Sequence, residues 1–96
     1  MINCRLLKFT GHAIRQMFIR RISDTDVRNV IQGGEIIMDY PDDKPLPIKL
    51  ILGFSNGRPI HVVLAYDAAN ETGYVITAYV PDENIWNNNY KSRRKP

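Results

Sequence analysis

The feature that most constrains the fold is a change of hydrophobic period at Gly33-Gly34. Before these glycines, apolar residues recur at helical spacing. After them, apolar residues gather in short runs that are separated by turn-forming residues, as in strands. The sequence therefore predicts helices first and strands afterwards. With 96 residues, the chain is long enough for a single domain with one core, spanning 1–96.

Two helices are predicted before the glycines. For the first, Thr10 is the expected N-cap, and its apolar stripe is formed by Ala13, Ile14, Met17 and Phe18. Ser23 is expected to cap the second helix, because acidic residues suit the first turn that follows it. The buried side of this helix is predicted at Val27, Val30 and Ile31, and Gly33-Gly34 is typical of a left-handed C-cap.

Strands are predicted over four stretches, namely 35–40, 48–54, 58–66 and 74–80. Residues 2–8 are mixed and could form an edge strand or simply lead into the first helix. Short connections between consecutive strands favour an antiparallel meander. We therefore expect an α+β domain with two N-terminal helices packed on a four-stranded antiparallel meander. A basic tail over 87–96 would follow and could be mobile.

The charges are segregated along the chain. Residues 1–32 carry six basic and two acidic side chains, whereas 33–86 carry three basic and eight acidic ones. The last ten residues add four basic side chains and no acidic one. Such blocks favour a basic surface that could bind RNA or DNA, the alternative being a solvated surface with a disordered end.

Composition also limits the compartment and the cofactors. Cys4 is the only cysteine, so neither an internal disulfide nor a zinc site made of a cysteine cluster is possible. No apolar run approaches the roughly 20 residues that a membrane helix needs, and no signal pattern is visible, so a cytoplasmic protein is expected. The acidic residues Asp39, Asp42 and Asp43 suggest a solvated turn more than a divalent ion site. We predict no metal and no other cofactor.

Both histidines are candidate catalytic residues. His61 lies in the middle of the most apolar predicted strand, and His12 opens the first helix. Histidine titrates nearest neutral pH and is therefore suited to proton transfer. If helix and strand pack together, the two rings could share one cleft. The alternative is that His61 is a hydrogen-bonded core residue and His12 only supports the helix start.

Arginines and a tyrosine could complete such a site. Arg15 and Arg20 follow His12 at helical spacing, and Arg58 lies at the start of the histidine-containing strand. Guanidinium groups hold phosphate in a bidentate manner. Tyr79 could donate or accept a proton or stack on a base, although it could equally be part of the sheet packing.

The C-terminal segment contains two aromatic residues. Trp86 and Tyr90 are four residues apart, which would place them on one side of a helical turn. We expect these aromatics to dock the segment to the body of the protein, with base stacking as the alternative.

The sequence resembles a family of small prokaryotic proteins catalogued as a domain of unknown function. The most specific string is Arg58-Pro59-Ile60-His61-Val62-Val63, and the likeness extends over nearly the whole chain. Further matching strings are Phe9-Thr10-x-His12-Ala13, Tyr40-Pro41-Asp42-Asp43 and Ile76-Thr77-Ala78-Tyr79-x-Pro81-Asp82. Members resemble RelE/ParE-like or MqsR-like toxins, which are encoded beside an antitoxin with a YgiT-type zinc finger.

The resemblance implies a RelE-like fold and a toxin that an antitoxin holds inactive. We therefore expect a metal-independent ribonuclease with RNA as substrate, in which His12, His61 and Tyr79 move protons. Phosphate-binding residues would be Arg15, Arg20, Arg58, Arg93 and Arg94. Two alternatives stay open, namely a non-catalytic inhibitor that binds a protein, as a ParE-like gyrase poison does, and a plain nucleic-acid-binding domain.

Overall fold

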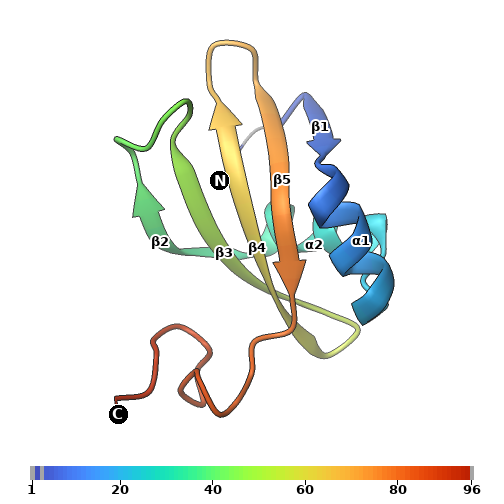
Figure 1. The fold of residues 1–96 in the computed structure, drawn as a ribbon, viewed down its shortest axis with the longest axis vertical. Coiled ribbons are helices and arrows are strands. Elements are labelled where there is room, and N and C mark those ends of the chain that lie inside the picture. Colours follow the sequence, from blue (N-terminus) through green and yellow to red (C-terminus); the bar gives the residue numbers. More distant parts are fainter. Residues whose placement is uncertain (1, 3, 96) are drawn as a thin grey trace.

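The computed structural model describes residues 2 and 4–95. Two helices lie near the N-terminus and most of the strands follow them, as the change of period predicts (Figure 1). The elements in chain order are β1 (Leu6–Phe9), α1 (Gly11–Arg20), α2 (Asp24–Gly33), β2 (Glu35–Tyr40), β3 (Ile48–Ser55), β4 (Arg58–Asp67) and β5 (Thr72–Tyr79).

The strands form one five-stranded mixed sheet in the order β1-β5-β4-β3-β2. The strands β2 to β5 form the predicted antiparallel meander, whereas β1 pairs with β5 in parallel, from Leu6 opposite Thr72 to Phe9 opposite Val75. The predicted sheet of four antiparallel strands was therefore wrong. The edge strand that the sequence allowed over 2–8 is present as β1, but no local pattern indicates its parallel partner β5, which lies far along the chain.

The predicted N-caps are confirmed. The Thr10 side chain accepts a hydrogen bond from the Ala13 backbone N–H at 3.0 Å. Ser23 and Asp26 form a reciprocal capping box at the start of α2, which satisfies backbone donors that a helix leaves unpaired.

The end of α2 differs from the prediction. Gly34 follows the helix in an extended conformation, with φ −83°, and not in a left-handed one. A Cβ at Gly34 would lie 2.3 Å from the Val30 carbonyl oxygen and 2.6 Å from that of Leu52. Close backbone approach is therefore the reason for glycine here. The left-handed cap occurs instead after α1, at Arg21, with φ 56°.

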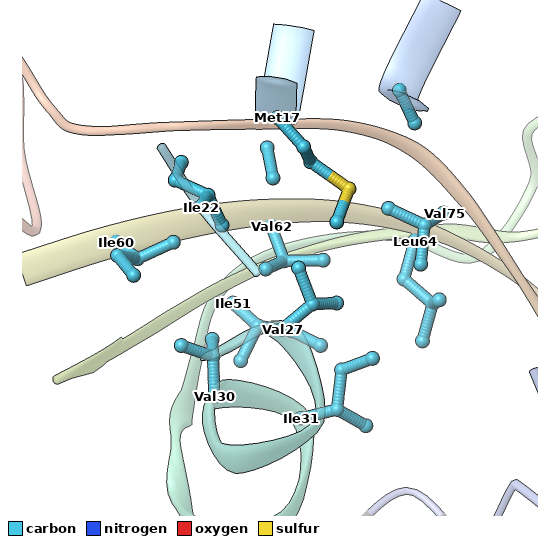
Figure 2. Close-up of a cluster of buried hydrophobic side chains, with 12 residues drawn as sticks. Met17, Ile22, Val27, Val30, Ile31, Ile51, Ile60, Val62, Leu64 and Val75 are labelled. Atoms are coloured by element: carbon cyan, nitrogen blue, oxygen red, sulfur yellow. The ribbon is translucent and has the colours of Figure 1, made fainter. Parts of the chain in front are cut away.

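The core lies between the helices and one face of the sheet. Figure 2 shows Val27, Val30 and Ile31 of α2 pointing toward strand residues, with Met17 of α1 above them. The cluster also contains Ala13, Ile22, Ile51, Ile60, Val62, Leu64, Val75 and Ala78. The buried side predicted for α2 is confirmed.

The stripe predicted for α1 is only half buried. Ala13 and Met17 are buried, whereas Ile14 is 57% and Phe18 86% exposed. At 100° per residue, Ile14 and Phe18 are turned away from the side that meets the sheet. The prediction that all four residues face the core was wrong for these two.

The C-terminal segment after β5 does not form the expected helical turn. The segment has turns at 83–85 and 88–89 and an isolated bridge between Trp86 and Arg93, and the rest of 82–95 is irregular. The docking role of the aromatics is confirmed, because Trp86 is 4% exposed and the Tyr90 ring lies edge-on to that of Phe54. In Figure 1 the segment leaves the lower end of β5.

Neither helix of the described residues has the length or the apolar character needed to span a bilayer.

Candidate functional site

The strand β4 presents different residues to the two faces of the sheet. Successive side chains of a strand point to opposite sides. Ile60 and Val62 belong to the core beneath the helices, so His61 points to the other face. There the C-terminal segment covers it, and its exposed fraction is 0%.

The His61 ring is held on three sides. Its centroid lies 4.4 Å from that of Trp86 and 5.2 Å from that of Tyr79, both at steep interplanar angles. Its Nε2 lies 2.7 Å from the Tyr90 carbonyl oxygen and its Nδ1 lies 3.2 Å from the Tyr79 hydroxyl. Both ring nitrogens therefore have partners.

These partners define the tautomer of His61. A carbonyl oxygen only accepts hydrogen bonds, so Nε2 carries the proton and donates to Tyr90. In the neutral ring Nδ1 is then the acceptor, and the Tyr79 hydroxyl donates to it. The result is a chain of two hydrogen bonds with the same donor-to-acceptor direction, from the Tyr79 hydroxyl to His61 and from His61 to the Tyr90 carbonyl. We call it the directed hydrogen-bond series.

Burial determines the protonation of this pair. It lowers the pKa of His61 from the ordinary value of 6.5, against the opposing effect of the hydrogen bond to the Tyr90 carbonyl. It raises the pKa of Tyr79, and the nearby charge of Arg93 partly counteracts that increase. His61 is thus a neutral base at neutral pH, and Tyr79 keeps its proton.

Tyr79 and Arg93 connect this series to the surface. Tyr79 is only partly buried, unlike His61, and Arg93 is exposed. The Arg93 guanidinium lies 5.6 Å from the Trp86 ring centroid, in cation–π geometry. A proton acceptor, a phenol and a cation therefore lie together at one end of the open face of the sheet.

His12 does not share this site. It is an exposed residue in the first turn of α1, which packs through Ala13 and Met17 on the opposite face of the sheet. The prediction that both imidazoles open onto one cleft was wrong. The alternation of side chains along β4 separates His61 from the helix layer, and the C-terminal segment closes over its ring.

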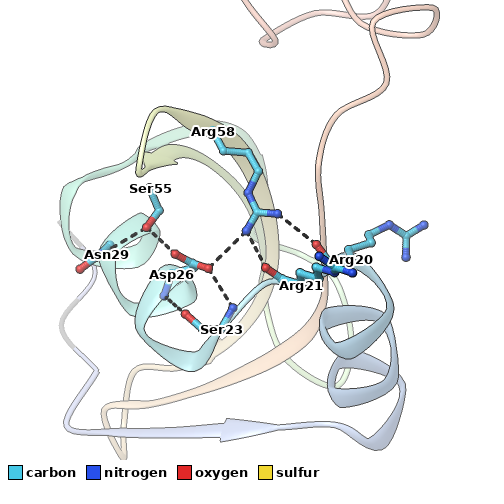
Figure 3. Close-up of polar contacts among 7 residues, drawn as sticks. All are labelled: Arg20, Arg21, Ser23, Asp26, Asn29, Ser55 and Arg58. Carbon is cyan, nitrogen blue, oxygen red and sulfur yellow. Dashed lines mark hydrogen bonds and ion pairs between the residues drawn. The ribbon is translucent and has the colours of Figure 1, made fainter.

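Arg58 is engaged within the protein, on the helix side. Its guanidinium donates to the carbonyl oxygens of Arg20 at 3.0 Å and Arg21 at 2.7 Å, and it pairs with Asp26 at 3.3 Å (Figure 3). Ser55 donates to the same carboxylate at 2.6 Å. Arg58 thus ties the end of α1 to the start of α2.

The hydrogen bonds around Asp26 also affect its ionisation. The pKa of its carboxyl group is lowered, first by the hydrogen bond from the Ser23 backbone and then by the one from Ser55. Burial acts in the opposite direction, and the charge of Arg58 contributes least. Asp26 therefore stays ionised as a structural anion between the helices and the β3–β4 hairpin.

The other predicted phosphate-binding arginines lie at separate places. Arg15 and Arg20 are exposed on α1, where Arg20 bonds to Gln16. Arg94 donates to the Glu83 carbonyl at 2.6 Å and to the Asn88 side chain at 3.0 Å, so it holds the turns of the C-terminal segment. Of the five predicted arginines, only Arg93 lies beside the Tyr79–His61 pair.

An apolar pocket of about 340 Å³ lies on the same face of the sheet as His61, toward the opposite end. Ala65 lies four residues after His61 in β4, so its side chain points to the same face, and it forms part of the pocket floor. The remaining lining residues are Thr10, Pro45, Leu46, Ile48, Tyr74 and Ile76. The open face thus offers an apolar hollow at one end and the polar Tyr79–His61 pair at the other.

Within the described residues, no three His, Cys, Asp or Glu side chains are grouped closely enough to hold a metal ion. Of the three acidic residues expected in a turn, Asp39 lies in β2 and pairs with Lys49 of β3 at 3.1 Å.

Sequence reasoning missed the part that the C-terminal segment has in this site. The acceptor for His61 is a backbone carbonyl, and any residue at position 90 would supply one, so no side-chain pattern indicates it. The sequence did contain a signal for Trp86, the only tryptophan, as a docking residue.

The chain belongs to the family described as Domain of unknown function (DUF4258), whose model matches residues 9–80. The match includes His61 and Tyr79 and ends before the segment that carries Trp86 and Tyr90. Searches of curated proteins and of solved structures found no match.

Proposed function

We propose that this protein is the toxin of a toxin–antitoxin pair and that it cleaves RNA without a metal ion. The observation that carries the proposal is the directed hydrogen-bond series from Tyr79 through His61 to the Tyr90 carbonyl. It leaves a polarised phenol on a partly open face beside the cation of Arg93. General acid–base catalysis requires a positioned side chain that can accept and return a proton, and Tyr79 backed by His61 meets this requirement.

The element order supports a RelE-like assignment. In that fold, which the sequence resemblance implies, helices precede an antiparallel sheet and a C-terminal helix or tail follows it. Here α1 and α2 precede the meander β2 to β5, and a basic segment follows β5. The site lies on the sheet face that the helices leave open.

RNA can be cleaved by its own 2′-hydroxyl, which attacks the neighbouring phosphorus and expels the 5′-oxygen. In the proposed reaction Tyr79 accepts the 2′-hydroxyl proton while its own proton passes to Nδ1 of His61. The P–O bond to the 5′-oxygen then breaks, and the proton returns along the same path to that oxygen. The products are a 2′,3′-cyclic phosphate and a free 5′-hydroxyl, so neither an oxidant nor a water molecule is consumed.

Each residue has a separate part in this reaction. Tyr79 is the catalytic residue, since it touches the reacting oxygens. His61 is a positioning residue that stores the proton, and its lowered pKa keeps it free to accept one. Arg93 would stabilise the additional negative charge of the pentacoordinate phosphate. Arg15 and Arg20 lie on the helix side, where they could hold only RNA that extends beyond the site.

The test is cleavage of mRNA in a cell-free translation reaction, which contains both free and ribosome-bound RNA. The wild type is expected to produce fragments with 2′,3′-cyclic phosphate ends. Tyr79→Phe removes the hydroxyl and should slow cleavage about 100-fold or more, the usual contribution of a general acid or base. The matched control is Tyr40→Phe, because Tyr40 is an exposed tyrosine of β2 whose hydroxyl meets Met38. Tyr40→Phe should cleave RNA at the wild-type rate. If Tyr79→Phe also cleaved at the wild-type rate, the catalytic role of Tyr79 would be refuted.

The α1 residues favour a second candidate, a ParE-like inhibitor that acts by binding a protein. Ile14, Phe18 and Ile19 are all more than half exposed, as a protein-binding surface requires. Induced expression in a bacterium distinguishes the two functions. Growth arrest by both the wild type and Tyr79→Phe would favour the inhibitor, whereas arrest by the wild type alone would favour the enzyme.

A further inference from the structure

The outward side of α1 is apolar where a surface helix is normally polar. Ile14 is 57%, Phe18 86% and Ile19 70% exposed. At 100° per residue, Arg15, Phe18 and Ile19 lie on the half of the helix that faces away from Ala13 and Met17, and Ile14 lies at the edge of that half. We call Ile14, Arg15, Phe18 and Ile19 the α1 surface. Apolar residues grouped in this way on a surface mark an interaction site.

The charges on α1 itself have a single sign. The helix contains Arg15 and Arg20, Arg21 follows directly, and the helix has no acidic residue. A partner that buries the apolar side chains must approach these cations, so acidic side chains in the partner would be favoured.

We propose that the α1 surface docks an amphipathic helix of a partner protein, with apolar residues on one side and acidic residues flanking them. Such a helix packs its apolar side against an exposed apolar surface, and the side chains that anchor the contact are one helical turn apart. Ile14 and Phe18 have this spacing on α1. The α1 surface lies across the sheet from Tyr79, so the proposal stands whether or not the protein cleaves RNA.

The probe is a synthetic 20-residue helical peptide with leucine on one side and glutamate on the others, and a second peptide carries lysine in place of glutamate. Binding to the full-length, ¹⁵N-labelled protein is followed by NMR. We expect saturable shifts that are centred on α1 with the glutamate peptide, an affinity that falls as salt is added, and no binding of the lysine peptide.

Three variants make the test specific. Phe18→Ser should lower the affinity for the glutamate peptide roughly 30-fold, as expected for a central apolar anchor. Arg15→Glu should reduce binding of the glutamate peptide and permit binding of the lysine peptide. Ile85→Ser is the matched control, because Ile85 is a 50% exposed apolar residue of the C-terminal segment and should not change the affinity. The three positions are exposed, so each variant should keep the fold.

Several outcomes would overturn the proposal. These are absence of saturable binding by the glutamate peptide, equal binding by the lysine peptide, and an unchanged affinity in Phe18→Ser. Concentration-dependent self-association that Phe18→Ser abolishes would also overturn it, because the occupant would then be a second copy of this chain.

Discussion

At the scale of single residues, His61 shows how burial and hydrogen bonding decide the chemistry of a side chain. The imidazole is fully buried and both of its nitrogens are hydrogen-bonded, so the ring is neutral and held in one tautomer. It is not accessible to a substrate. Its neighbour Tyr79 keeps part of its surface accessible and can act for the pair. In the proposed enzyme, contact with the substrate is therefore assigned to the tyrosine and not to the histidine.

The lowered pKa of His61 predicts how stability and activity change with pH. The unfolded chain binds a proton on His61 as pH falls through about 6.5, whereas the folded protein binds it only at lower pH. The free energy of unfolding should therefore decrease as pH falls below 6.5, until the lower pKa of the folded state is passed. Denaturant unfolding between pH 7 and pH 5 measures this decrease.

The control for the pH prediction is His61→Gln, which keeps an amide near the Tyr90 carbonyl but cannot titrate. Its unfolding free energy should lose this part of the pH dependence. In the proposed enzyme, the cleavage rate of the wild type should fall only below pH 6.5 as the solution is made more acidic. The pH at which the rate falls should differ in His61→Gln. A wild-type protein whose stability rises from pH 7 to pH 5 would contradict the assignment.

At the scale of elements, glycines define how closely α2 approaches the sheet. A Cβ at Gly53 of β3 would lie 2.8 Å from the Val30 Cα, which is backbone and cannot turn aside. Gly34 has the same restriction at the end of the helix. The packing of α2 against β3 and β4 thus depends on the absence of a Cβ at Gly34 and at Gly53.

Gly53→Ala should therefore destabilise the protein, by about 1–3 kcal/mol, as overpacking in a core does. The matched control is Gly33→Ala, because a Cβ at Gly33 meets nothing within 4 Å and alanine favours a helix. Gly33→Ala should be neutral or stabilise by roughly 0.5–1 kcal/mol. Equal unfolding midpoints for Gly53→Ala and the wild type would show that α2 moves aside without cost.

At the scale of the whole molecule, the sheet separates two surfaces. One face carries the helices, the Arg58 network and the α1 surface. The other carries the apolar pocket and the Tyr79–His61 pair, over which the C-terminal segment folds. RNA chemistry and partner binding are therefore proposed for opposite sides of one small domain.

Removal of residues 87–96 tests whether the C-terminal segment shields His61 and stabilises the protein. The truncated protein lacks the Tyr90 carbonyl and the cover over His61. Its unfolding free energy should fall by about 0.5–1.5 kcal/mol, the net contribution of one hydrogen bond, because water can then solvate the His61 donor. Because burial is the largest cause of the lowered pKa, NMR titration should show the His61 pKa rising toward its ordinary value. An unchanged pKa would show that the segment does not shield the ring.

Sequence alone determined α1, α2 and the strands β2 to β5, because helix caps, hydrophobic period and turn residues act over a few neighbours. Thr10, Ser23 and the apolar runs of β3 to β5 indicated their structures directly. Only the tertiary structure decided which residues meet. The parallel pairing of β1, the exposure of Phe18, the use of Arg58 and the closure over His61 all depend on contacts between distant segments. Such contacts follow from how whole faces pack, and no local pattern encodes them.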